Sequence, residues 1–346
     1  MPILRKSCTR ILPPKSSKGK WGMLGILLLL LCVAILASIR CGSQNYSIGQ
    51  ILSSLQAGDQ GDTIWRVVMH VRLPRTLGCL LAGCALAVAG VLIQSVLNNA
   101  MASPSIIGVN AGAGFFALLS AILLPGVSGI VSAASFIGAL LATLLIYGLA
   151  LRAGLSRTTL ILAGIAVSSM LTAGIDTITL LYPDTVMGAT GFMLGGFSGV
   201  TFSAIQGAAL YLLIGLVMAG FLATDLNVLQ LGEESAASLG LHIGRTRFLA
   251  IVATALLAGA AVSFAGLLGF VGLLVPHAAR RLIGNDNVWL LPASALLGGV
   301  FVMSCDLLAR ILFAPFELPV GIVMSLLGGP FFLFLLLRHK RSRVYG

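Results

Sequence analysis

Ten apolar segments follow one another along this chain, most of them as long as a helix that crosses a lipid bilayer. Such a helix needs about 20 apolar residues. Only 9% of the 346 residues are charged, whereas a soluble domain carries roughly 25%. We therefore expect an all-α polytopic membrane protein with ten transmembrane helices, and we disfavour a soluble enzyme or a partner made of nucleic acid. The segments are 21–39, 76–97, 105–124, 129–150, 158–182, 201–223, 246–265, 267–283, 289–310 and 319–337.

The distribution of lysine and arginine predicts which segment ends face the cytoplasm, because basic residues stay in cytoplasmic loops. With the N-terminus inside and all ten segments crossing, 16 of the 21 basic residues lie inside and five, all arginines, lie outside. Segment 267–283 is short and interrupted by Pro276 and His277. If it did not cross, the basic C-terminal tail would lie outside. We therefore expect ten spans with both termini in the cytoplasm.

A single membrane domain, 21–337, is expected between two basic tails, 1–20 and 338–346. Segment 21–39 follows a basic tail, as a signal peptide does, but it exceeds the 7–15 apolar residues of such peptides and lacks a clear cleavage site. We predict that it is retained as the first span. The largest cytoplasmic loop is 224–247.

Glycine accounts for 42 residues and is spread through the predicted spans. Small residues let membrane helices approach closely, so this composition favours a compact bundle. Segment 183–200 is apolar but contains Pro183 and many glycines. We expect it to form a short helix or a re-entrant piece at the outer face rather than a regular span.

The sequence lacks the motifs that catalysis, nucleotide binding or metal binding would need. It has no G-x-x-x-x-G-K-[S/T] loop, so this chain is not expected to bind ATP by itself. Its six cysteines have no zinc-ligand spacing, and its four histidines are far apart. We expect no cofactor, no bound metal and no enzymatic activity.

Three of the five arginines predicted to lie outside stand at the outer ends of the second and ninth predicted spans. They are Arg72, Arg75 and Arg310. Asp306 lies four residues before Arg310, so the two can pair on one helix face. Because the arginine fork binds carboxylates with two donors, the pattern favours an acidic docking partner or an anionic ligand. The alternative is interfacial arginine that extends its charge into water.

The cytoplasmic loop contains a short helical pattern at 232–241. Glu233 and Glu234 lie in its first turn, where the helix dipole favours acids, and Gly240 lies at its end. A helix this short is unstable alone. It therefore predicts a packing partner, such as another chain, although an interfacial connector is the alternative.

Several blocks, in this order, resemble the FecCD-type permease family of ABC importers, the type II importers for iron-siderophore, haem and cobalamin complexes. The resemblance covers nearly the whole chain after the N-terminal tail. The blocks are 72–76 (RLPRT), 99–102 (NAMA), 108–114 (GVNAGAG), 232–241 (GEESAASLGL), 269–277 (GFVGLLVPH), 306–310 (DLLAR), 317–321 (ELPVG) and 328–332 (GGPFF).

This resemblance implies a cobalamin-importer-like permease fold with ten helices per subunit in the cell membrane. It implies a second permease subunit, identical or a paralogue, that forms a dimer around a central pathway. Two copies of a separate ATPase subunit would supply the energy. An extracytoplasmic binding protein would deliver the cargo, and membrane lipid would surround the subunits.

The resemblance also implies roles for particular residues. Arg72, Arg75 and Arg310 would receive acidic residues of the binding protein. Asn99 and Met101 would form the cytoplasmic gate, although 99–102 reads NAMA where the family usually has Asn-Pro-Leu-Ala. The helix that couples to the ATPase would comprise Gly232, Glu233, Glu234, Ser235, Ala236, Ala237, Ser238, Leu239 and Gly240.

Two other classes of function fit the sequence less well. An ion-coupled secondary carrier would need charges near the membrane midplane, whereas Asp176 and Asp306 lie towards the outer ends of their spans. An intramembrane enzyme would need a nucleophile with a base, or a metal set, at one depth. For the cargo we favour an iron-siderophore, with haem or cobalamin as alternatives, because siderophores are the commonest cargo in the family.

Overall fold

The computed structural model describes residues 17–42, 46–57, 62–154, 156–312, 314 and 316–343. Four basic residues of the predicted N-terminal tail, Arg5, Lys6, Arg10 and Lys15, lie outside the described residues. The helices are α1 (Ser17–Arg40), α2 (Ile48–Ala57), α3 (Thr63–Val67), the π-helix η1 (Val68–Arg72), α4 (Leu73–Leu97), the 3-10 helix η2 (Pro104–Ile107), α5 (Val109–Leu123), α6 (Ile130–Arg152), α7 (Arg157–Leu181), α8 (Pro183–Leu194), α9 (Phe202–Leu229), α10 (Glu233–Ser238), α11 (Ile243–Ala265), α12 (Val271–Ile283), α13 (Asn287–Ile311) and α14 (Val320–Arg343).

All ten predicted spans are helical, and the described ranges contain no strand, so the all-α prediction is confirmed. Within those ranges, seven helices are long and apolar enough to cross a membrane. The other three predicted spans correspond to α5 and α12, which have 15 and 13 residues, and to α14, whose apolar part is Val320–Phe334. The predicted short helix after the fifth span is α8, which has 12 residues.

The helix ends differ from the ends of the apolar segments. α3, η1 and α4 form one continuous helix from Thr63 to Leu97, so the second span extends beyond its predicted start. α9 continues to Leu229 and α11 begins at Ile243, which leaves a connection shorter than the predicted loop 224–247. α14 continues through most of the predicted C-terminal tail, to Arg343. Hydropathy falls where a helix leaves the membrane, but the backbone hydrogen bonds of the helix can continue into water.

The predicted span 105–124 is broken at Gly108 into η2 and α5. Gly108 has a φ of 78°, a conformation that glycine adopts without the steric cost of a side chain. Ile106 and Ile107, which hydropathy places in the span, therefore belong to the short 3-10 helix before it.

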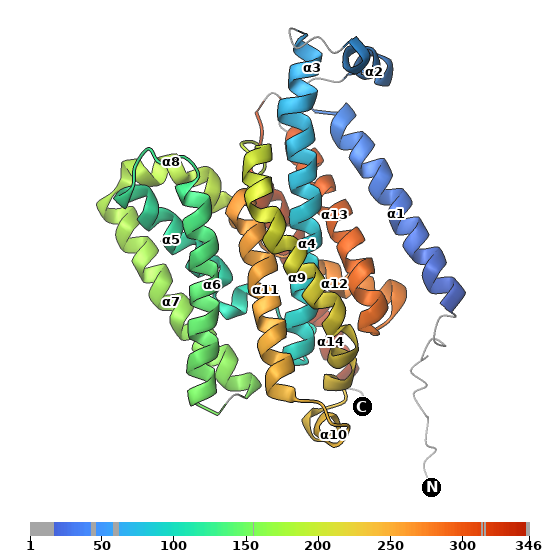
Figure 1. The fold of residues 1–346 in the computed structure, drawn as a ribbon, viewed down its shortest axis with the longest axis vertical. Coiled ribbons are helices and arrows are strands. Elements are labelled where there is room, and N and C mark those ends of the chain that lie inside the picture. The colour runs from blue at the N-terminus through green and yellow to red at the C-terminus, as the bar shows by residue number, and fades with distance from the viewer. Residues whose placement is uncertain are drawn as a thin grey trace.

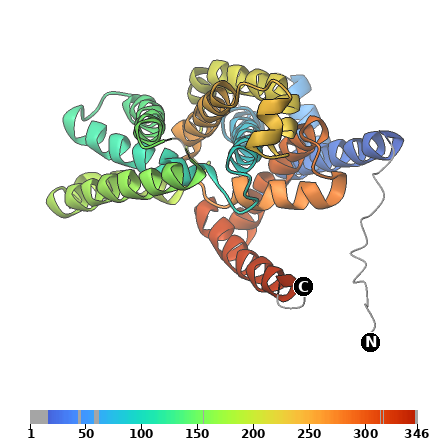
Figure 2. The same cartoon turned by 90° about the horizontal axis from the view of Figure 1, so that it is seen from below.

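Helix α4 runs through the middle of the bundle and packs against α9, α11, α12 and α13 (Figure 1). Helices α5, α6, α7 and α8 form a group on one side, and α1 lies against α13 on the other. α10 and the C-terminus lie at one end of the molecule, and α2 and α3 lie at the opposite end. The view from below shows α14 leaving the bundle on a separate side from α1 (Figure 2).

Glycines set the distance between α4 and two of its neighbours. A Cβ on Gly83 would overlap the backbone of Gly298 in α13, and a Cβ on Gly90 would overlap the backbone of Gly272 in α12. These overlaps involve backbone atoms, which cannot rotate away as a side chain can. The expected role of small residues in close helix packing is thus realised around α4.

Replacing Gly83 by leucine is expected to lower the free energy of unfolding by roughly 1–3 kcal/mol, because the side chain would force α4 and α13 apart. The measurement is the thermal unfolding midpoint of the detergent-solubilised protein. Gly220→Leu is the matched control, since a Cβ on this exposed glycine of α9 meets nothing within 4 Å. Equal midpoints for the two variants would contradict this account of the packing.

Candidate functional site

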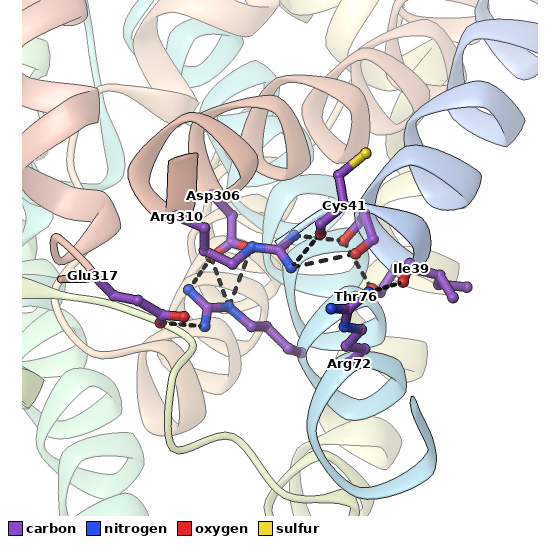
Figure 3. A network of polar contacts seen from close by, with 9 residues as sticks. Ile39, Cys41, Arg72, Thr76, Asp306, Arg310 and Glu317 are labelled. Atoms are coloured by element: carbon purple, nitrogen blue, oxygen red, sulfur yellow. Dashed lines mark hydrogen bonds and ion pairs between the residues drawn. The ribbon is translucent and has the colours of Figure 1, made fainter. Parts of the chain in front are cut away.

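Arg75 joins two carboxylates towards the end of the bundle where α2 and α3 lie. Its Nε lies 3.0 Å and 3.1 Å from the two carboxylate oxygens of Asp306, and its Nη2 lies 2.9 Å from Asp306 Oδ1. Its Nη1 donates to Glu317 Oε2 at 2.6 Å. Asp306 is fully buried and Arg75 is only 5% exposed. Arg75 therefore ties α4 to α13 and to the loop that precedes α14 (Figure 3).

Arg310 connects the same carboxylate to the end of α1. Its Nε lies 3.0 Å from Asp306 Oδ2, which confirms the predicted i, i+4 pair. Its Nη1 donates to the carbonyl oxygens of Ser38 and Cys41, at 3.3 Å and 3.2 Å, and its Nη2 donates to Ser38 Oγ at 3.0 Å. The Ser38 hydroxyl in turn lies 2.8 Å from Thr76 Oγ1 in α4.

Arg72 holds the end of α1 from the other side. Its Nη1 donates to the carbonyl oxygens of Ile39 and Arg40, at 2.7 Å and 2.8 Å. Its guanidinium lies over the ring of Tyr46, 4.6 Å from the centroid, which is a favourable cation–π distance.

The structure thus brings the three predicted arginines together, but all three are buried rather than open at the surface. They line a cavity of about 280 Å³, which we call the arginine cavity. The sequence pattern identified the Asp306–Arg310 pair because it is local on one helix. It gave no sign of the pairing between Arg75 and Glu317, whose positions are 242 residues apart.

The short helix α3 contributes Thr63 and Val67 to the wall of the arginine cavity. Asp62 caps this helix by accepting a hydrogen bond from the backbone N–H of Ile64 at 3.1 Å, and the Ser54 hydroxyl also donates to Asp62. Together these hydrogen bonds lower the pKa of Asp62 below its usual value, and the bond from Ser54 has the largest effect.

A second cavity, of about 330 Å³, lies beside the first, and we call it the pathway cavity. The aromatic side chains of Phe192, Phe197 and Phe264 line it, together with the backbone at Gly196 and the start of α14 at Val320. Its polar lining includes Ser132, Ser198, Ser263, Arg75 and Glu317. The lining thus combines aromatic and polar groups and includes an ion pair.

At the opposite end of the molecule, α10 forms the short helix that the sequence predicted. Glu233 pairs with Arg247 of α11 at 2.6 Å and lies 3.9 Å from Arg157 of α7. Ala236 within α10 is buried. Leu231 and Leu239, which flank α10 in the chain, are 64% and 65% exposed. α10 is therefore fixed to the bundle through Glu233 and Ala236, and an exposed leucine lies just before it and another just after it in the chain.

The predicted gate residues lie in the loop between α4 and η2. Asn99 is exposed and its side-chain oxygen accepts a hydrogen bond from the backbone N–H of Met101 at 2.9 Å. Met101 is half-buried. Asn98 ends α4 in the left-handed conformation, with a φ of 45°. The chain thus turns sharply here without the proline of the usual family pattern.

Two glutamine side chains make polar contacts at or next to loop 98–103, which we call the gate loop because it holds the predicted gate residues, and sequence reasoning missed these contacts. Gln94 donates to the carbonyl oxygens of Ala102 and Gly272, at 3.1 Å each, and accepts a hydrogen bond from Arg280 of α12. Gln230, at the end of α9, donates to Ser95 at 3.1 Å. The second contact connects the α10 region to the end of α4. Gln94 stood out only as a polar residue within an apolar span.

Within the described part of the chain, no three His, Cys, Asp or Glu side chains gather where they could hold a metal ion. Cys79 and Cys305 are buried, whereas Cys32 is exposed on α1.

Comparison with known proteins gives consistent matches over nearly the whole chain. The chain is 35% identical to the hemin transport system permease protein HmuU of Yersinia pestis, over 93% of this chain and 97% of the relative. It is 37% identical to the iron-uptake system permease protein FeuB of Bacillus subtilis, over 89% and 93%. It is 39% identical to the cobalamin import system permease protein BtuC of Halobacterium salinarum, over 80% and 74%.

The fold resembles that of a metal-chelate type ABC transporter solved in an inward-facing conformation. The TM-score is 0.82 at 27% identity, and the match covers 92% of this chain and 99% of the solved chain. The family model described as the FecCD transport family matches residues 29–338. These relatives are permease subunits of ABC transporters rather than enzymes, and this chain belongs to the FecCD transport family.

Proposed function

We propose that this chain is the permease subunit of an ABC importer that moves an iron-siderophore across the cell membrane, with both termini in the cytoplasm. The observation that carries the proposal is the match to permeases that are named for iron uptake and iron(3+)-hydroxamate import, at 37% and 36% identity. Relatives named for hemin and cobalamin keep these two cargoes as alternatives. The pathway cavity offers aromatic, hydroxyl and charged groups that a chelate could contact in transit.

The assembly we propose contains two permease subunits, identical or paralogous, two copies of an ATPase subunit and an extracytoplasmic binding protein. Large apolar side chains remain exposed along α7, including Leu162, Ile165 and Met170. Surface of this kind needs lipid or a second subunit to cover it.

Growth tests the cargo directly. A strain lacking this gene is expected to lose growth on a siderophore as its single iron source and to keep growth on inorganic iron in excess. If the strain loses only growth on haem, the siderophore assignment is wrong and haem is the cargo. If it loses only cobalamin uptake, cobalamin is the cargo. Unchanged growth and uptake on every tested chelate would contradict the importer role.

The binding protein is proposed to dock over the arginine cavity, with an acidic side chain directed at its arginines. Arg72, Arg75 and Arg310 carry three positive charges against the two negative charges of Asp306 and Glu317, so this cluster of five keeps one positive charge in excess. A carboxylate entering the cavity would balance that charge and could accept two hydrogen bonds from one guanidinium.

Replacing Arg72 by glutamine is expected to weaken binding of the binding protein about tenfold or more, because the incoming carboxylate loses a charged donor. The measurement is the affinity of the purified binding protein for the permease–ATPase complex. Arg40→Gln is the matched control, since Arg40 is exposed at the end of α1 and does not line the cavity. Equal affinities for wild type and Arg72→Gln would rule out docking at this cavity.

At the cytoplasmic end, residues 232–240 are proposed to seat in the ATPase subunit, and Asn99 and Met101 to form the gate. The exposed Leu231 and Leu239 beside α10 support the first assignment, because exposed apolar side chains anchor protein interfaces. The Gln230–Ser95 hydrogen bond offers a short route by which movement of α10 could reach the gate loop. An ion-coupled carrier is not favoured by any comparable observation.

A further inference from the structure

Two cavities at the outer end of the bundle share one pair of side chains. Arg75 and Glu317 line both the arginine cavity and the pathway cavity, and no other described residue lines both. The two side chains form an ion pair in which Arg75 Nη1 lies 2.6 Å from Glu317 Oε2. This pair therefore stands between the proposed docking site and the space next to α8 and α14.

The geometry of the Arg75 fork makes only one of its carboxylate partners replaceable. Nε and Nη2 face Asp306, which is fully buried on α13. Nη1 faces Glu317, whose side chain is 34% exposed. A carboxylate that arrives from outside cannot displace the buried Asp306 from Nε and Nη2. It can compete with Glu317 for Nη1.

The backbone that follows Glu317 forms part of the wall of the pathway cavity. Leu318 N–H donates to the carbonyl of Ala309 at 3.3 Å, and Gly321 N–H donates to the carbonyl of Gly195 at 3.1 Å. A Cβ on Gly321 would overlap the carbonyl oxygen of Leu194, so the start of α14 lies directly on the end of α8. Segment 317–321 is thus held at three points, by Arg75 of α4 at Glu317, by α13 at Leu318 and by the end of α8 at Gly321.

We propose that Glu317 links docking of the binding protein to the opening of the pathway cavity. An acidic side chain of the binding protein takes the place of Glu317 on Arg75 Nη1. Release of Glu317 removes the ionic contact among the three that hold segment 317–321, so less free energy is needed for the start of α14 to move away from α8. Glu317 is a positioning residue in this scheme, which rests on the proposed docking at the arginine cavity.

The variant Glu317→Gln tests this link in proteoliposomes that contain the complete permease–ATPase complex. Glutamine keeps the size of the side chain but removes the charge that competes with the incoming carboxylate. We expect ATP hydrolysis without binding protein to rise about fivefold, and the affinity for binding protein to rise by a similar factor. A fivefold change corresponds to about 1 kcal/mol, which is typical of a partly exposed ion pair. Stimulation of hydrolysis by the binding protein should fall correspondingly.

Two further variants separate this link from a structural role. Glu317→Asp keeps the charge and should restore low basal hydrolysis and strong stimulation. Asp184→Asn removes an exposed carboxylate of α8 that lines neither cavity, and it should behave as wild type. A merely structural role would lower the unfolding midpoint and both hydrolysis rates together, which would overturn the proposal.

Wild-type basal hydrolysis and stimulation in Glu317→Gln would also overturn it. If the docking proposal itself is wrong, Arg72→Gln will leave the affinity for binding protein unchanged, which distinguishes that outcome from failure of the link through Glu317. If Arg72→Gln weakens docking while Glu317→Gln changes nothing, docking stands and the link through Glu317 is wrong.

Discussion

Replacing Asp306 by alanine is expected to lower the free energy of unfolding by about 3–5 kcal/mol, the cost of removing one partner from a buried ion pair. The carboxylate is fully buried and lies between Arg75 and Arg310, which are 5% and 3% exposed. Without it, two guanidinium groups remain buried side by side with no charge between them. The contacts of α4, α13 and α1 at the outer end would loosen together.

The thermal unfolding midpoint in detergent measures this effect, and Asp184→Ala is the control. Asp184 is an exposed carboxylate on α8, so its loss should change stability by less than about 0.5 kcal/mol. An Asp306→Ala midpoint equal to that of the control would show that the arginines find other partners, and would contradict the account of the network.

Replacing Leu239 by glutamate is expected to reduce ATP-driven uptake about thirtyfold while leaving the stability of the isolated permease unchanged. Leu239 is 65% exposed next to α10, so the folded permease does not depend on it. In the assembly proposed above it would be buried against the ATPase subunit. An interface anchor of this kind contributes about 2 kcal/mol or more, equivalent to that factor.

Uptake and ATP hydrolysis are measured together in proteoliposomes, because loss of coupling affects their ratio. Val288→Glu is the matched control, since Val288 is 48% exposed near the start of α13 and lies outside the α10 loop. Deletion of residues 233–239 should abolish coupled uptake altogether. Normal coupled uptake in that deletion would refute the coupling role of α10.

The sequence predicted the elements of this fold well because each is a local property. Each apolar segment contains a helix, and the pattern at 232–241 became a short helix with Gly240, at a φ of 82°, just beyond its end. The spacing of Asp306 and Arg310 predicted their pairing, because residues four apart share one helix face.

The ends of the helices were less predictable. Hydropathy marks where a chain leaves the membrane, whereas a helix ends where its backbone hydrogen bonds stop. α9 and the helix formed by α3, η1 and α4 both continue past the membrane segment for this reason. Gly108 interrupts a span that hydropathy treats as continuous.

The sequence by itself determined the class of the protein, the number of apolar segments and the presence of arginines at one end of the bundle. Only the tertiary structure decided that those arginines are buried together and that Arg75 joins Asp306 to Glu317. The physical reason is that these contacts depend on how closely α4 approaches α13, which the Gly83–Gly298 contact sets. Residue spacing along one helix cannot encode a distance between two helices.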